Sequence, residues 1–169
     1  KERDPRLVTI RRGGTLTDSD HHLLAIWAAE CAEHVLHRFE EEHPSDPRAR
    51  RAIDAIRAWT TGDLEMMATR AAGGHAMGAA RDLRGPARWA AFAAGQAACV
   101  AHVPEHDLGA AAYAIKAARA ADPEDEDLAG RRECDWQHRQ LPSSIRDLVI
   151  EDQGWRNAIC WSVFQTPGR

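Results

Sequence analysis

Residues 89–118 read WAAFAAGQAACVAHVPEHDLGAAAYAIKAA, and this stretch decides the fold class. From Trp89 to Val103 nearly every side chain is small, and a helix of that composition is normally buried because neighbouring backbones can approach it closely. Pro104 either kinks this helix or starts the next one, since proline lacks the N–H that a continuing helix needs. The stretch therefore predicts two consecutive interior helices. The second has its apolar face at Leu108, Ala111, Ala112 and Ile115.

Helical patterns continue on both sides of this stretch. Thr17-Asp18-Ser19-Asp20 resembles a capping box, and Asp46-Pro47 places a cap residue and a proline at the start of another helix. Alternation typical of a strand occurs only weakly, at Leu7–Ile10. We therefore predict a single compact all-α domain of about seven helices. The predicted boundaries are an extended arm at 1–16, the helical domain at 17–164 and a tail at 165–169.

An apolar stripe that should face the core is also predicted on the first, third and last helices. In the first helix the stripe consists of Leu24, Trp27, Ala28, Cys31, Val35 and Phe39. In the third helix it consists of Leu64, Met67, Ala68 and Ala71. In the last helix it consists of Ile145, Leu148, Val149, Asp152, Trp155 and Ile159.

The chain contains one short internal repeat. His75-Ala-Met-Gly-Ala-Ala80 is echoed thirty-one residues later by His106-Asp-Leu-Gly-Ala-Ala111. The repeat suggests a duplicated helical element, although alanine-rich segments align easily by chance. His102, Tyr113 and Lys116 have no counterparts in the first copy, so a site is expected where the copies differ.

Composition excludes several functions. Lys and Arg total 22 against 26 Asp and Glu, a formal net charge of -4, whereas a general nucleic-acid binder needs clustered cations. No stretch approaches the roughly 20 apolar residues of a membrane span. The chain starts at Lys1 without a signal-peptide pattern, and its natural N-terminus is not defined by this sequence. Four widely spaced cysteines without a CxxC pair favour a cytoplasmic protein with reduced thiols.

Two groups of residues have the spacing of a metal site, and neither completes one. His102 and His106 would share a face of an unbroken helix, but Pro104 separates them and the HExxH pattern is absent. Glu30, His34, His37 and Glu41 form a row on the first helix, yet no second ExxH helix supplies partners. We expect neither a metal nor another cofactor.

The remaining candidates are ionisable residues on apolar helices. Lys116 could act as an amine of lowered pKa or bind an anion, although such a side chain more often extends to solvent. Asp152 would need a cationic partner if buried. If the protein is an enzyme, we expect its catalytic residues among His102, His106, Lys116, Glu30 and Asp152.

Three segments together resemble the Imm-5-like family of small bacterial immunity proteins. They are DHHLLAIWAAECAEHVL (20–36), AHVPEHDLGAAAYAIKA (101–117) and ECDWQHRQLP (133–142), and the resemblance covers roughly residues 6 to 160. It implies an all-helical cytoplasmic protein that neutralises a partner toxin. It supplies no established catalytic residues. The positions that match recurring family residues are His102, His106, Lys116, Trp136 and Gln137.

These observations support an immunity or antitoxin-like protein whose partner is a toxin or a companion subunit, with no nucleic acid and no membrane involved. Its acidity would suit a basic partner. The alternative is an enzyme or enzyme subunit that acts on a small, anionic molecule of bacterial specialised metabolism. A third hypothesis is a homo-oligomeric scaffold that uses exposed tryptophans. The sequence leaves open whether Trp136, Trp155 and Trp161 belong to the core or to an interface.

Overall fold

The computed structural model describes residues 2–165, and it confirms the predicted all-α class. Those residues contain no β-strand, only an isolated bridge between Thr9 and Leu16. The seven α-helices are α1 (Asp18–Glu40), α2 (Arg48–Thr60), α3 (Met66–Ala80), α4 (Gly85–Cys99), α5 (Asp107–Ala121), α6 (Glu126–Gln140) and α7 (Ser143–Arg156). Four 3-10 turns complete the described structure: η1 (Pro5–Leu7), η2 (Ile10–Arg12), η3 (Pro104–His106) and η4 (Asn157–Cys160).

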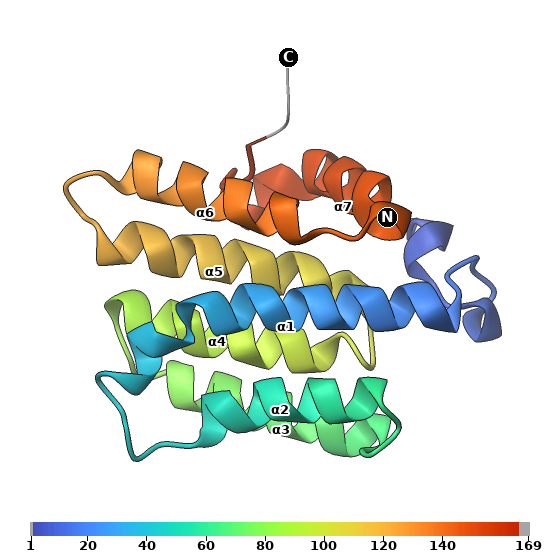
Figure 1. Cartoon of the computed structure of the whole chain (residues 1–169), viewed down its shortest axis with the longest axis horizontal. Coiled ribbons are helices and arrows are strands. Elements are labelled where there is room, and N and C mark those ends of the chain that lie inside the picture. Colours follow the sequence, from blue (N-terminus) through green and yellow to red (C-terminus); the bar gives the residue numbers. More distant parts are fainter. Residues whose placement is uncertain (1, 166–169) are drawn as a thin grey trace.

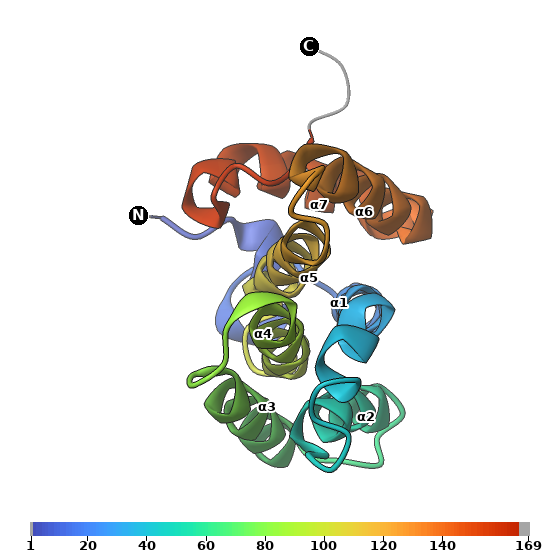
Figure 2. The same ribbon diagram turned by 90° about the vertical axis from the view of Figure 1, so that its left-hand side faces the viewer.

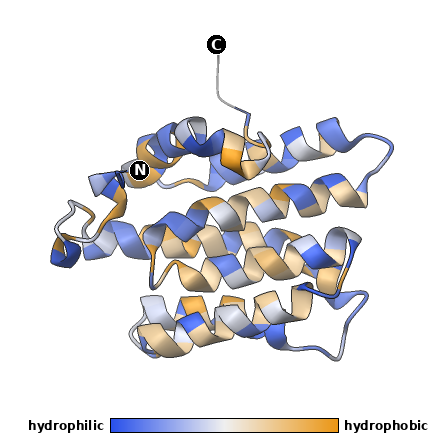
Figure 3. Ribbon diagram, turned by 180° about the vertical axis from the view of Figure 1, so that it is seen from behind, coloured by the Kyte–Doolittle hydropathy of each residue, from blue (hydrophilic) through white to orange (hydrophobic). Residues whose placement is uncertain are grey.

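The helices stack in tiers around α4 (Figures 1 and 2). Helices α2 and α3 form one edge, α1, α4 and α5 the middle, and α6 and α7 the opposite edge. Helix α4 packs against α1, α2, α3 and α5, and this central position explains its composition. Alanine and glycine leave room for neighbouring backbones on every side. Figure 3 shows these alanine-rich helices in pale apolar colours beside a mostly hydrophilic α6.

Helix α1 follows the sequence prediction closely. Thr17 is its N-cap, and the side-chain oxygen accepts a hydrogen bond from the backbone N–H of Asp20 at 3.1 Å. All six residues of the predicted stripe are buried. Trp27 also donates its indole N–H to the carbonyl of Gln137 in α6 (2.9 Å), so this large side chain satisfies its only polar group. The hydrogen bond fixes the distance between α1 and α6.

The stripe predicted for the third helix is wrong. Met67 is 54% exposed, and Ala68 and Ala71 also face outward. Small residues on several sides of this helix give no clear apolar face, so the pattern did not define its rotation. The buried positions of α3 are Thr69, Gly73, Ala76, Ala79 and Ala80.

Gly73 and Gly95 bring α3 and α4 into close contact. A Cβ placed on Gly73 would lie 2.7 Å from the Gly95 carbonyl oxygen, and one on Gly95 would lie 2.8 Å from the Gly73 carbonyl oxygen. Only glycine fits this crossing, because the backbones occupy the space that a side chain would need. Gly73 is therefore a packing position rather than a weak point of the helix.

The stripe predicted for the last helix is correct only in part. Ile145, Val149 and Asp152 are buried, whereas Trp155 is 80% and Ile159 is 67% exposed. Helix α7 ends at Arg156 and the tighter turn η4 follows, so the α-helical period no longer applies at Ile159. Helix α7 also lies in the outermost tier, where few elements can cover its end (Figure 2).

Two further segments differ from what the sequence predicts for them. The N-terminal segment, expected to be extended, folds into η1 and η2 and buries Leu7. The two repeated hexapeptides occupy unequal places, since His75 lies exposed in the second half of α3 whereas His106 caps the start of α5. Their similarity therefore gives no structural support for a duplicated element. Among residues 2–165, no helix has both the length and the apolarity that a membrane crossing needs.

Candidate functional site

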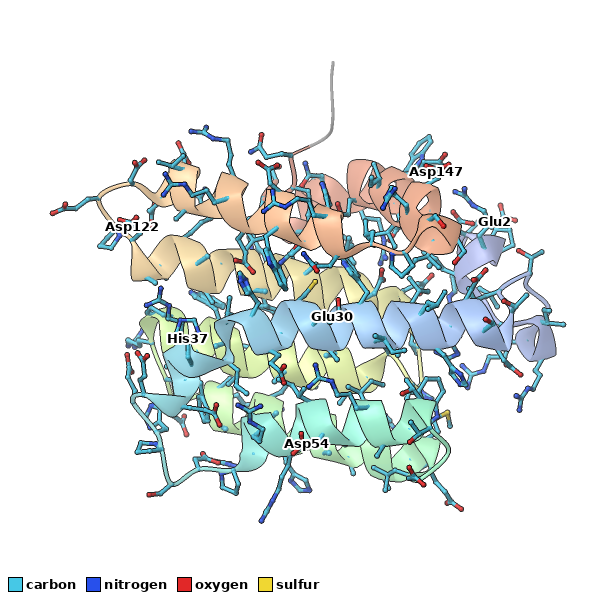
Figure 4. All side chains as sticks on the ribbon, in the orientation of Figure 1. Glu2, Glu30, His37, Asp54, Asp122 and Asp147 are labelled. Atoms are coloured by element: carbon cyan, nitrogen blue, oxygen red, sulfur yellow. The ribbon has the colours of Figure 1, made fainter. Side chains whose placement is uncertain are left out.

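The five residues proposed for an enzyme do not share one pocket. His102 and His106 lie together at the turn between α4 and α5. Lys116 lies ten residues further along α5, about 15 Å away at 1.5 Å of rise per residue. Asp152 lies in α7 and Glu30 midway along α1 (Figure 4). A reaction at a single centre would need these groups within contact distance of one substrate.

His106 is held by its neighbours in α4. Its Nδ1 donates to Oε1 of Gln96 at 2.8 Å, and burial lowers its pKa. Gly109 packs directly against the same Gln96 side chain. His106 therefore has a structural role at the junction between α4 and α5. Within the described residues, no group of three or more His, Cys, Asp or Glu is arranged to hold a metal ion.

His102 lines a cleft of about 400 Å³, which we call the His102 cleft. The cleft lies where the N-terminal segment crosses the start of α1, the end of α2 and the turn after α4. Its apolar wall includes Trp59 and Met66. The rings of His21 and His22 lie 4.8 and 4.9 Å from the Trp59 ring. The full lining is Arg3, Val8, Thr9, Arg11, Arg12, Asp18, His21, His22, Trp59, Met66, Ala101, His102 and Pro104.

Lys116 belongs to a different arrangement, an aromatic cluster between α4, α5 and the C-terminal segment. Its Nζ lies 4.1 Å from the ring centre of Trp89 and 3.9 Å from that of Trp161. Tyr113 stacks with Trp89 at 5.9 Å and lies 5.2 Å from Trp161. Burial, with the charges of Arg119 and Arg88, lowers the pKa of Lys116. The ammonium is thus engaged in cation–π contacts.

The aromatic cluster continues into an exposed apolar segment. Trp155, Ile159 and Trp161 are 80%, 67% and 49% exposed, and they lie within seven residues of one another. Trp161 itself contacts Tyr113 and Trp89 of the cluster. We call these five residues the C-terminal aromatic surface: Trp89, Tyr113, Trp155, Ile159 and Trp161.

The backbone of this surface adopts an uncommon conformation. Trp161 and Ser162 both have φ of 56°, in the left-handed region that non-glycine residues rarely occupy. Asn157 holds the turn by accepting from the Phe164 N–H (3.0 Å) and donating to the Phe164 carbonyl (3.1 Å). Such strain, of order 1–3 kcal/mol per residue, persists only where surrounding contacts maintain it.

Asp152 has the cationic partner that burial requires. Arg156, one turn later in α7, donates to both Asp152 oxygens, at 2.7 Å from its Nε, and to the Glu105 carbonyl at 3.2 Å. The cation that a buried Asp152 requires is thus a residue of the same helix, four positions later. The nearby Asp107 is 1% exposed, and its Oδ1 has no hydrogen-bond partner. Burial, aided by the Asp152 charge, raises the pKa of Asp107 to about 7.

Of the row Glu30, His34, His37 and Glu41, His34 makes contacts with α6. His34 donates to Glu133 of α6 at 2.9 Å and stacks on Trp136 at 3.6 Å. Burial raises the pKa of Glu30 and of Glu133. Of the three tryptophans whose location the sequence left open, Trp136 packs between α6 and α1, whereas Trp155 and Trp161 reach the surface.

Sequence reasoning missed the residues that lie around His102. Arg12, Trp59 and Arg70 come from three separate elements, and no local spacing relates them to the turn after α4. Asp107 was also missed, although an acid between His106 and an apolar helix face was visible in the sequence. Its burial depends on α7, which packs against the start of α5.

Comparison with known proteins identifies the family. Residues 14–144 match the family described as Imm-5 like putative immunity protein, and the chain belongs to that family. No curated protein and no solved structure matches it.

Proposed function

We propose that this protein binds and neutralises a toxin, and that the C-terminal aromatic surface is where the toxin binds. Membership of an immunity family supports the partner class. The observation that supports this surface is the exposure of Trp155, at 80% the most exposed large apolar side chain of the described residues. We further propose that the protein acts in the cytoplasm as one member of a heteromeric complex.

Burial of this surface would provide much of the free energy of binding. A tryptophan presents about 150–250 Å² of surface. Covering the exposed four-fifths of Trp155 therefore contributes a gross gain of about 3–5 kcal/mol at 25 cal/mol per Å², before the cost of association is subtracted. Tryptophan and tyrosine are also the residues most enriched among those that dominate protein interfaces. The aromatic contacts and the held turn at Asn157 orient Trp161 in advance, which reduces the entropy lost on binding.

The enzyme alternative has weaker support. It needs His102, His106, Lys116, Glu30 and Asp152 around one substrate. In the structure His106 is bonded to Gln96, Lys116 lies between two indoles and Asp152 pairs with Arg156. Each of these three groups has a structural partner, so none of the three is poised for proton transfer to a ligand shared with His102 and Glu30.

The proposal is tested with the product of the gene adjacent to the one that encodes this chain. The two proteins are co-expressed to measure protection of growth, and the affinity of the purified pair is measured by calorimetry. Trp155→Ala should weaken binding at least about 30-fold, the equivalent of 2 kcal/mol. Met67→Ala, which removes an exposed apolar side chain from α3 at the opposite edge, should change the affinity less than about threefold.

Three results would overturn the proposal. The toxin assignment fails if the neighbouring gene product neither binds the chain nor is neutralised by it. The assignment of the surface fails if Trp155→Ala binds as tightly as the unsubstituted protein. It also fails if light scattering shows that Trp155→Ala instead dissociates a homo-oligomer, because the surface would then join copies of this chain.

A further inference from the structure

We infer that the His102 cleft binds a small organic anion, whose charged group lies among Arg12, His102 and Arg70 and whose apolar body lies against Trp59 and Met66. The ligand class is a phosphate monoester with an aromatic or similarly flat apolar part. This site is separate from the C-terminal aromatic surface, and the inference does not depend on toxin binding.

The first argument is the charge of the cleft wall. Three arginines and three histidines line it, against a single carboxylate, Asp18. Arg11 pairs with Asp18 at 3.1 Å, and Arg3 pairs with Glu105 at 3.1 Å. Among residues 2–165, Arg12 forms no ion pair, so its charge is available to a ligand. The chain as a whole is acidic, which makes this local excess of cationic groups distinctive.

The second argument is the position of His102 between two hollows. It lines the His102 cleft with Arg12, and it lines a neighbouring hollow of about 470 Å³ with Arg70 of α3. Like Arg12, Arg70 forms no ion pair within the described residues. Burial and the charges of Arg70 and Arg12 lower the pKa of His102. His102 thus lies between Arg12, which lines one hollow with it, and Arg70, which lines the other.

The third argument is an unsatisfied polar atom. Nδ1 of His102 is buried and has no hydrogen-bond partner among the described residues. Burying such an atom without a partner is unfavourable, and a bound ion or ligand group is one way in which its hydrogen bond is completed. An imidazole N–H and two guanidinium groups are the donors that a phosphate accepts, and arginine binds phosphate through two parallel hydrogen bonds.

The size and apolar wall of the cleft define the rest of the ligand. About 400 Å³ lies in the range of small-molecule sites, and it exceeds what a bare phosphate ion needs. Trp59, Met66 and Pro104 provide an apolar side. His21 donates to the Val100 carbonyl at 2.7 Å, and its ring contact with Trp59 helps to fix the indole. The apolar body would lie against this fixed wall.

Phenyl phosphate, inorganic phosphate and phenol are the probes, each titrated into the full chain by calorimetry and by ¹⁵N NMR at about 150 mM salt to screen non-specific attraction. We expect saturable binding of phenyl phosphate, at least about tenfold tighter than that of phosphate or phenol. The largest amide shifts should fall at Ala101, His102 and Trp59. Arg12→Gln and Arg70→Gln should each weaken binding at least about tenfold.

Arg131→Gln is the matched control, since it removes an exposed arginine of α6 outside the cleft. Arg12 and Arg70 are also exposed, so all three variants should fold, as checked by circular dichroism. The inference is overturned if phenyl phosphate does not saturate the protein, or if it binds no tighter than phosphate or phenol. It is also overturned if Arg131→Gln weakens binding as much as Arg12→Gln does.

Discussion

Replacement of Asp107 by asparagine should remove a specific pH dependence of stability. Burial raises the pKa of this carboxyl from its ordinary 3.8 to about 7, so the folded chain holds a proton that the unfolded chain has released. The free energy of unfolding therefore falls as pH rises from about 4 to 7, by 1.36 kcal/mol per unit. Between pH 5 and pH 8 this amounts to about 2.5 kcal/mol. The amide of Asp107→Asn does not titrate. The free energy of unfolding of this variant minus that of the unsubstituted protein should therefore increase by about 2.5 kcal/mol between pH 5 and pH 8.

Urea unfolding at pH 5, 6, 7 and 8 measures the effect. The difference between the two proteins is the relevant quantity, because burial lowers the pKa of His21 and of His106 and these groups change stability in the opposite direction over part of the same range. Asp147→Asn, an exposed change on α7 (Figure 4), controls for the loss of one negative charge. A difference between Asp107→Asn and the unsubstituted protein that stays constant within about 0.5 kcal/mol from pH 5 to pH 8 would refute the argument.

Two pairs of substitutions test the packing. Gly73→Ala should lower the free energy of unfolding by roughly 1–3 kcal/mol, because the new Cβ meets the Gly95 carbonyl, whereas Gly74→Ala, with open space around it, should raise it by up to about 1 kcal/mol. Equal urea midpoints for the two alanine variants would contradict the close helix crossing. Trp27→Phe loses the hydrogen bond to Gln137 and leaves a gap between α1 and α6, so it should cost about 2 kcal/mol or more. Trp155→Phe, the exposed counterpart, should stay within about 0.5 kcal/mol, and a similar loss in both variants would show that Trp27 is not a core residue.

Large apolar side chains made parts of this fold predictable. Trp27, Leu24 and Phe39 recur at helical spacing, and they are too large to be left in water without cost, so the buried face of α1 follows from its sequence. Helix α3 lacks such markers on its inner side. Its burial is decided by the close contact of Gly73 with Gly95, a property of two segments that neither shows alone.

For the candidate sites, the sequence could identify single residues but not the residues that surround them in the fold. His102 stood out as an unexplained histidine at a proline turn. Its partners are contributed by the N-terminal turns, by the end of α2 and by α3, which the fold brings together from far along the chain. Trp155 continues the apolar period of α7, yet it is 80% exposed. Periodicity reports which side of a helix a residue lies on, but not whether another element covers that position.

One series of polar contacts connects residues beside the His102 cleft with residues beside the C-terminal aromatic surface. Arg3, on the wall of the His102 cleft, pairs with the carboxylate of Glu105 in η3, and Arg156 of α7 donates to the Glu105 carbonyl. Arg156 also holds Asp152 and directly follows Trp155. A partly buried ion pair of this kind adds little net stability, because desolvation offsets its attraction, but it restricts where its elements can lie. The network therefore mainly fixes the position of α7 relative to the turn that carries His102. The same contacts thus help to position both the His102 cleft and the C-terminal aromatic surface.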